Sequence, residues 1–315
     1  MEYLGQLGRI LSRAVLTPTP TLPMRRTGQA LRMRTPVAAV AAAVLCLGIP
    51  AIQAEQIQRN FPTSATPSFL LHNHTGSISV KSWEQNEIEI RGESFSDVVE
   101  IMIEGGPEKV SVQTHPKREG IPPQQLRVDF QIRVPRRATV RLDCESGNLI
   151  VVEDLQGDVF IESVSGRVEL SRVQGNISVR TMDGPILIRD SAGHIEARSI
   201  SGNLEFIGVN GSQLIGNTNS GTISYEGDFG SGGNYVLNNH SALIRIQPSL
   251  RSSFDLKARA VEGVIESDLT FLPIPFATPF RRLSPRKFVQ GRINSGESTV
   301  TITSFSGTIR LHRPR

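Results

Sequence analysis

Glycine recurs every nine or ten residues in the middle of this chain. The recurring glycines are Gly147, Gly157, Gly166, Gly175, Gly184, Gly193, Gly202, Gly211 and Gly221. The residue before the glycine alternates in kind: Ser or Asp at one turn, then Gln, Ala or Asn at the next. The repeating unit is therefore a pair of nonads, 18 or 19 residues long. Glycine suits tight corners because it adopts positive φ without steric cost. Two short strands and two such turns would make one coil.

Apolar residues alternate within each nonad. Positions two and four after the glycine hold the pairs Leu149/Val151, Val159/Ile161, Val168/Leu170, Ile177/Val179, Ile186/Ile188, Leu204/Phe206 and Ile223/Tyr225. A period of two indicates a strand with one buried face. Position seven is often apolar too, and we expect it to turn inward: Val164, Val173, Met182, Ile200 and Val209. Identical turns at a fixed period favour stacked parallel coils over a hairpin meander. The pattern predicts an all-β, right-handed parallel β-solenoid with a less regular N-terminal β section and a C-terminal cap.

The first 54 residues have the composition of a leader. Arg32 and Arg34 precede an apolar run at 37–47, and small residues follow up to Ala54. This order is typical of a secretory signal peptide, and the run is shorter than the roughly 20 residues of a spanning helix. We expect cleavage after Ala54, with retention of the leader as an anchor left open, as is the choice of start codon. The sequence thus predicts an exported protein of the periplasm or cell surface, with no spanning segment after cleavage.

The charge of the chain comes from this leader. The whole chain carries a formal charge of +4, but residues 1–54 hold six arginines and one acidic residue. The remainder has 28 basic and 29 acidic residues, a net charge of −1. A basic footprint is the first requirement for nucleic-acid binding, so that class of function is excluded.

The composition divides the rest of the chain into five segments. Residues 55–67 are predicted to be a flexible start, 68–142 an irregular β section, and 143–270 the regular β-solenoid. Residues 271–290 break the rhythm with four prolines and a basic cluster, and 291–315 read as a terminal β coil. For 68–142, a looser part of the same stack and a small sandwich-like cap both fit the sequence. The basic segment fits a surface loop or a contact site for a polymer or partner, whose candidate residues are Arg281, Arg282, Arg286 and Lys287.

The sequence offers little for catalysis or metal binding. His72 and His74 would share one face of a strand, but no third ligand is evident, so surface histidines are preferred and no metal is predicted. The turns lack the aspartate column of calcium-binding nonapeptides. Cys144 takes the place of a small hydroxyl residue in a stacked column, followed by Ser163, Thr181, Ser199, Thr218 and Ser304. No cofactor motif is found.

A polysaccharide-active β-helix enzyme needs convergent carboxylates. Coils of 18 residues would instead stack Glu162 with Arg180 and Arg198, and would separate Glu169 from Glu205 by Leu187. Such mixed ladders stabilise stacked strands. The sequence therefore favours a non-catalytic scaffold, with the enzyme as the alternative.

Three stretches carry a resemblance to a known family. They are HNHTGSISVKSWEQNEIEIRGE, QIRVPRRATVRLDCESGNLIVVEDLQGDVFIESVSGRVEL and STVTITSFSGTIRL. With the signal peptide, they resemble the bacterial putative-adhesin family of unknown function, relatives of the adhesin-head-like solenoid proteins. The resemblance spans roughly residues 66–312. It implies an exported β-solenoid of Gram-negative-type bacteria without established enzymatic activity, and it supplies no functional residues.

Together these observations predict an exported, non-catalytic β-solenoid of the cell envelope. It would display its faces to an envelope protein or a surface polysaccharide. A structural or regulatory envelope scaffold is a second alternative.

Overall fold

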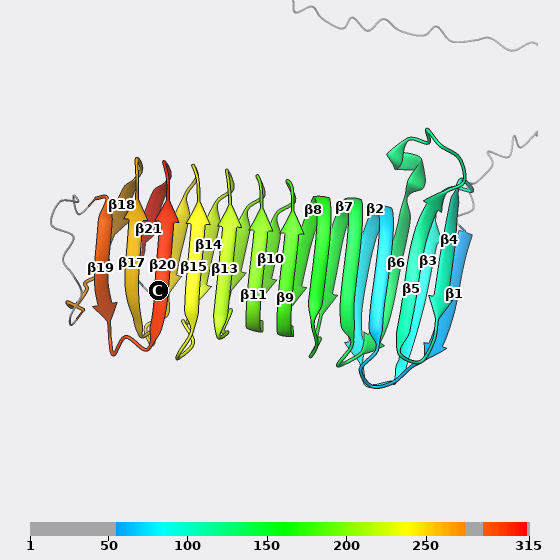
Figure 1. The fold of residues 1–315 in the computed structure, drawn as a ribbon, viewed down its shortest axis with the longest axis horizontal. Helices are drawn as coiled ribbons and strands as arrows, with labels where there is room; N and C mark the ends of the chain where they lie inside the picture. The colour runs from blue at the N-terminus through cyan, green and yellow to red at the C-terminus, as the bar shows by residue number, and fades with distance from the viewer. Residues whose placement is uncertain (1–54, 275–285, 314–315) are drawn as a thin grey trace, which may run out of the picture. The chain divides into compact units, whose positions relative to one another are not determined.

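The computed structural model describes residues 55–274 and 286–313, all of which belong to one compact unit, Pro50–Arg315. The signal peptide predicted at 1–54 lies outside these residues. The described chain is all-β: 21 strands join in one mostly parallel sheet, and one short 3₁₀ helix is the only helix within these ranges. Figure 1 shows the strands side by side in a long row.

The strands fall into three groups along the chain. The N-terminal group is β1 (Glu55–Pro62), β2 (Ser68–Trp83), β3 (Glu87–Ser94), β4 (Val99–Gly105), β5 (Lys109–Pro116), the 3₁₀ helix η1 (Pro123–Leu126) and β6 (Val128–Pro135). The central group is β7 (Thr139–Glu153), β8 (Val159–Ser171), β9 (Gln174–Thr181), β10 (Ile186–Arg189), β11 (Ala192–Ser199), β12 (Leu204–Ile207), β13 (Gln213–Thr218), β14 (Ile223–Gly227), β15 (Asn234–Asn239) and β16 (Ile244–Pro248). The last group is β17 (Phe254–Ala260), β18 (Val264–Ser267), β19 (Phe288–Ile293), β20 (Ser298–Ser304) and β21 (Thr308–Leu311).

From β8 to β14, each strand pairs in parallel with the strand two places further along the chain, and the long strand β8 also pairs with β7 and β9. Strands β8, β10, β12, β14 and β16 form one row, and β8, β9, β11, β13 and β15 form the other. In the second row, Ile177 lies opposite Ile195, which in turn lies opposite Leu214. Contacts between neighbouring rungs join residues 18, 19 or 21 positions apart. The parallel stacking predicted from the glycine period is therefore present. The sequence separation between facing residues increases from 18 to 21 towards β15.

Close stacking, more than positive φ, explains the glycines of the turns. A Cβ on Gly184 would lie 2.0 Å from the carbonyl oxygen of Gly166, and one on Gly193 would lie 2.1 Å from that of Gly175. Gly193 has φ of 125°, but Gly184 is not among the positive-φ residues. The explanation by φ alone is thus incomplete. Successive turns pack backbone on backbone, and only a residue without a side chain fits between them.

The apolar residues at position seven divide into two sets. Val173 and Val209 are fully buried as predicted, but Val164, Met182 and Ile200 are 47%, 52% and 52% exposed. The prediction is wrong for the second set because the residue before each one takes the inward place. Those residues are Ser163, Thr181 and Ser199, which are buried. Before Val173, by contrast, Arg172 has φ of 54° and reverses the alternation.

The first coil also departs from the predicted pattern. The alternation predicts that Leu149 and Val151 face the core, but Ile150 and Val152 are the fully buried residues. The ladder between β7 and β8 shifts register between Ser146 and Leu149. Since strand side chains alternate faces, one extra residue exchanges the inward and outward sets.

The N-terminal group continues the same sheet. Strand β2 pairs in parallel with β7 on one side and with β5 and β6 on the other. Antiparallel pairs form the N-terminal end of the sheet: β3 with β6, β4 with β5, and β1 with β3. The expected flexible start at 55–67 is instead largely a strand, because β1 is paired along its whole length with β3. An antiparallel edge ends the parallel stack without a further coil.

The C-terminal coil lies inside the row of strands. Strand β20 pairs with β15 on one side and β17 on the other, and β21 lies between β16 and β18 (Figure 1). The antiparallel strand β19 covers the free edge of β17. The segment predicted as a loop at 271–290 therefore ends in a strand, and 275–285 lie outside the described residues. The predicted terminal coil at 291–315 does not act as the cap.

The core runs along the stack between the two rows. It is aliphatic in the centre, where Ile177, Ile186 and Ile195 are at most 1% exposed. Towards β17 it becomes aromatic: Phe229 stacks on Tyr225 with ring centroids 4.4 Å apart and meets Phe254 edge-on at 4.8 Å. The core therefore changes from aliphatic to aromatic along the stack.

Candidate binding face

The outward side chains of the β8, β9, β11, β13 and β15 row lie in register. Glu162 lies opposite Arg180, and Arg180 opposite Arg198, as the sequence predicts. Arg180 Nη1 lies 3.5 Å from Glu162 Oε1, and both side chains are about half exposed. This column continues from charged residues to amides at Asn217 and Asn238. The face thus changes along the stack from a charged to a neutral hydrogen-bonding surface.

The amide end of this face has its own local order. Asn238 Nδ2 donates to Asn217 Oδ1 at 2.9 Å, which spaces the two amides along the stack. At the adjoining turns, the ring of His240 stacks on that of Phe305 with a centroid distance of 4.7 Å and an interplanar angle of 3°. Phe305 is 39% exposed. We call the following set the amide–aromatic patch: Arg198, Asn217, Asn219, Asn238, His240 and Phe305.

The patch contains a depression, and hydrogen bonds fix the turns beneath it. Its depression is lined by Arg198, Ser199, Asn217, Thr218, Asn219, Asn238, Asn239 and His240. Beneath it, Thr218 Oγ1 accepts a hydrogen bond from Gly221 N at 3.1 Å, and Asn239 Nδ2 donates to Ala242 O at 2.6 Å. These bonds fix the turns that carry Asn219 and His240. Hydrogen-bonded turns therefore carry Asn219 and the ring pair, and the partly exposed amides of Asn217 and Asn238 lie on the strands beside them.

The chemistry of the patch is that of recognition. Side-chain amides offer both donors and acceptors and stay uncharged at all ordinary pH values. An exposed, stacked aromatic pair offers an apolar face next to those polar groups. A ligand with alternating hydroxyl and C–H surfaces satisfies both. Sequence reasoning missed this patch because Phe305 reaches it only through the pairing of β20 with β15, across 65 residues of chain.

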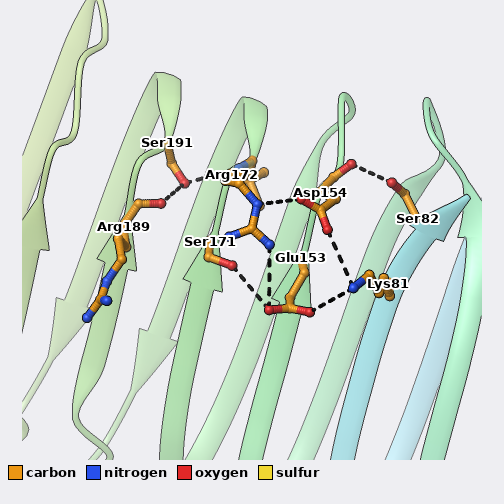
Figure 2. A network of polar contacts seen from close by, with 9 residues as sticks. Lys81, Ser82, Glu153, Asp154, Ser171, Arg172, Arg189 and Ser191 are labelled. Carbon is orange, nitrogen blue, oxygen red and sulfur yellow. Dashed lines mark hydrogen bonds and ion pairs between the residues drawn. The ribbon is translucent and has the colours of Figure 1, made fainter.

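A second cluster of charges lies where β2, β7 and β8 end (Figure 2). Arg172 Nε lies 2.5 Å from Asp154 Oδ1, and Lys81 Nζ lies 3.6 Å from Glu153 and 3.8 Å from Asp154. The hydrogen bond from Arg172 lowers the pKa of Asp154. The Ser82 hydroxyl donates to the Asp154 carbonyl. Each acid here is matched by a cation from a neighbouring rung, so the cluster joins three rungs.

The two other acids weighed for catalysis remain apart. Glu169 lies opposite Leu187, which lies opposite Glu205. Cys144 lies in register with Ser163, as predicted, and its side chain is 4% exposed. Burial raises the pKa of the Cys144 thiol to about 11, which keeps it protonated near neutral pH. A protonated, buried thiol is a packing group and a poor nucleophile.

The basic residues named from the sequence are only partly described. Arg281 and Arg282 lie outside the described residues. Lys287 Nζ donates to the carbonyl oxygens of Glu262 and Gly263 at 2.6 and 2.7 Å. The Arg286 carbonyl accepts from Ile265 N at 2.7 Å. Both residues thereby hold the segment before β19 against the turn between β17 and β18.

The histidine pair has a third neighbour that the sequence did not reveal. One ligand atom from each of His72, His74 and Glu145 lies within 4.8 Å of the other two. Glu145 comes from β7, which pairs with β2. The third group could have been found from the sequence only by knowing that these strands are neighbours.

Comparisons with known proteins place the chain only broadly. No family model matches the sequence, and no curated protein matches it. A crystal structure of a putative cell adhesion protein from Clostridium sporogenes is similar over 83% of this chain and 100% of its own, with 10% identity and a TM-score of 0.27. A crystal structure of a putative adhesin from Bacteroides fragilis is similar over 82% of this chain and 97% of its own, with 10% identity and a TM-score of 0.36. Both TM-scores are below 0.5. Within 55–274 and 286–313, no helix has the length and apolar character to cross a membrane.

Proposed function

We propose that this chain is an exported, non-catalytic, right-handed parallel β-solenoid that acts as an adhesin-like binding protein at the cell envelope of a Gram-negative-type bacterium. Its coils repeat after 18 to 21 residues, and it binds a surface polysaccharide through the amide–aromatic patch. The observation that carries the proposal is the in-register column of Asn217 and Asn238 beside the exposed His240–Phe305 pair.

A polymer suits this face because the face is itself periodic. Paired strands are about 4.8 Å apart, so each column offers a polar group at that interval along the stack. A chain of linked sugars carries hydroxyl groups at regular intervals and apolar ring faces between them. The amides of Asn217 and Asn238 match the hydroxyls, and Phe305 matches a ring face.

The leader of the sequence supports export, and the charge of the mature part argues against nucleic-acid binding. The leader combines Arg32 and Arg34, the apolar run at 37–47 and the small residues that end at Ala54. The mature part has a near-neutral charge, which does not attract nucleic acid.

The distribution of charge supports a non-catalytic role. Glycoside hydrolysis uses two carboxylates facing one bond. On this chain Asp143 and Glu162 lie opposite each other, but Glu162 is paired with Arg180, and Leu187 separates Glu169 from Glu205. The segment with Arg281, Arg282, Arg286 and Lys287 is proposed as a second contact for anionic groups of the polymer.

The test measures binding of the chain to arrays of purified bacterial polysaccharides. Asn217→Ala, Asn238→Ala and Phe305→Ala should each weaken binding at least tenfold. The matched controls are Asn148→Ala, an exposed amide on β7, and Phe95→Ala, a residue that is 37% exposed, close to the 39% of Phe305. Both controls should bind like the parent chain.

Each outcome separates the hypotheses. Binding that survives all three patch variants contradicts the patch, and loss on replacing Arg281, Arg282, Arg286 and Lys287 by Ser would then assign binding to that segment. Cleavage of a bound polymer would indicate the enzyme. Absence of binding to any polymer would indicate a structural or regulatory scaffold. Fractionation with an antibody to the mature chain tests export, and recovery in the cytoplasm contradicts it.

A further inference from the structure

His72, His74 and Glu145 lie together where β2 and β7 run side by side. His72 lies opposite Asp143 in this ladder, Asn73 opposite Cys144, and Thr75 opposite Ser146. The register therefore places Glu145 across from His74. His72 and His74 are partly buried, while Asn73 between them is fully buried, so the two rings share the outward face of β2. The rings meet edge-on with centroids 5.4 Å apart.

The hydrogen bonds beneath this face set the tautomer of His74. Asn73 Nδ2 donates to the carbonyl oxygens of Thr75 and Val128 at 3.1 and 3.0 Å, so its Oδ1 is left to accept. The hydroxyl of Thr114 donates to that Oδ1 at 3.2 Å. The single hydroxyl proton of Thr114 is used in that hydrogen bond. Thr114 Oγ1 can therefore only accept a hydrogen bond from His74 Nδ1, which lies 3.2 Å away.

These hydrogen bonds orient His74 so that it can bind a ligand through Nε2. Because Nδ1 carries the proton, the lone pair of neutral His74 is on Nε2. A ring nitrogen held by a polar neighbour, with the other left free, is the arrangement seen in metal-binding histidines. Thr114 is fully buried, so this orientation is held rigidly.

A second carboxylate lies next to the three groups. Asp143 Oδ1 is buried and has no hydrogen-bond partner, and Oδ2 lies 3.9 Å from Arg141 Nε. An unpartnered buried carboxylate oxygen is costly unless it meets a cation or a proton donor. Its position opposite His72 adds negative charge to the cluster.

We propose that His72, His74 and Glu145 bind a divalent transition-metal ion of the zinc class. Two imidazoles and a carboxylate suit Zn²⁺, whereas Ca²⁺ and Mg²⁺ require oxygen ligands alone. Bonds of about 2.0–2.2 Å to a tetrahedral ion would hold the three ligand atoms about 3.3 Å apart. They now lie within 4.8 Å of one another, and the Glu145 side chain is exposed, so the ion would draw the three groups together. His72 and Glu145 also line a depression that includes Glu162 and Val164, from which water or a group of a bound partner could supply a fourth ligand.

The test is calorimetric titration of the full chain, without a histidine tag, with zinc chloride, repeated with Co²⁺ for its absorption spectrum. The parent chain should bind one Zn²⁺ per chain, and Co²⁺ should give the intense visible bands of a four-coordinate ion. His72→Ala, His74→Ala and Glu145→Gln should each lower the affinity at least tenfold. His194→Ala, an exposed histidine on β11, is the matched control and should bind like the parent chain.

Every result decides the proposal. The proposal is overturned if the folded parent chain shows no saturable Zn²⁺ binding. It is also overturned if all three variants bind Zn²⁺ as tightly as the parent chain. Equal loss in His194→Ala also overturns it, because that pattern indicates scattered surface binding. Circular dichroism confirms that each variant is folded. If a histidine variant does not fold, Glu145→Gln decides the question, since that exposed side chain leaves the packing untouched. Zn²⁺ binding is independent of polysaccharide binding, so either proposal can fail alone.

Discussion

Thr181 Oγ1 lies 2.9 Å from Ser199 Oγ, its counterpart 18 residues further along the chain. Ser199 Oγ in turn accepts from Gly202 N at 2.8 Å, and Thr181 Oγ1 lies 2.7 Å from Gly184 O. The same buried position is held by Asn73, Cys144, Ser163, Thr218, Asn239 and Ser304. One column of small polar side chains thus closes each turn and also links it to the next.

Thr181→Val should therefore destabilise the chain. Valine keeps the shape but leaves the buried Thr181 partners unsatisfied, at a cost of about 1–3 kcal/mol in the free energy of unfolding. Urea unfolding followed by circular dichroism measures the loss. Ser178→Val, an outward position on the same strand, should change stability by less than about 0.5 kcal/mol. Equal effects in the two variants would show that the column contributes no hydrogen-bond energy.

Gly184→Ala should disturb the stack at a turn. Its new methyl group would lie 2.0 Å from the Gly166 carbonyl oxygen, and backbone atoms cannot move aside cheaply. We expect a loss of about 1–3 kcal/mol or more. In the control Gly106→Ala the nearest atom would be 3.9 Å away, so its midpoint of thermal unfolding should stay close to that of the parent. A stable Gly184→Ala variant would mean that successive turns are further apart than described.

Cys144 should resist alkylation while the chain is folded. Burial raises its pKa to about 11, so at pH 8 the thiolate is scarce as well as shielded. Iodoacetamide followed by peptide mapping, which distinguishes Cys144 from Cys46, should show modification only in denaturant. Cys144→Ser should fold normally, because serine fills this position in the next rung. Rapid labelling of the native chain would show instead that this part of β7 opens.

The Asp154–Arg172 pair should make stability depend on pH in the acidic range. The hydrogen bond from Arg172 lowers the pKa of Asp154 in the folded chain below that of the unfolded chain. Its contribution is therefore complete above the unfolded pKa and is lost as the pH falls through the folded one. Because Asp154 is 34% exposed, the contribution is below about 1 kcal/mol. Asp154→Asn retains a residue type that tolerates φ of 62°. The stability gap between parent and variant at pH 7 should close as the pH falls below the ordinary pKa of an aspartate, and a gap that is constant with pH would contradict the assignment.

Local repetition made the centre of the chain predictable. The glycine period identifies which residues stack, so the Glu162–Arg180–Arg198 column and the register of Cys144 with Ser163 follow from counting alone. Counting fails where one residue is inserted, as at Leu149, and where the backbone enters the left-handed region, as at Arg172. Neither event has a marker in the sequence that separates it from an ordinary strand residue.

The candidate sites depend on pairings between distant segments, which the period does not encode. Glu145 meets the two histidines because β7 lies beside β2. Phe305 meets His240 because β20 lies beside β15. In both cases the sequence shows the chemically able residues, and only the strand order brings them together.

The position of β20 and β21 also affects how this chain folds. Strands β15 and β16 cannot acquire their next neighbours until the polypeptide has passed through β17, β18 and β19 and returned. The contact between Ser306 and His240 closes a loop of 66 residues. Such non-local closure slows folding, so this half of the stack should form late, whereas β9 to β13 can add rung by rung. A nascent chain that ends before Ser298 would expose the edge of β15 to pairing with other chains, and quality control of such fragments would begin there.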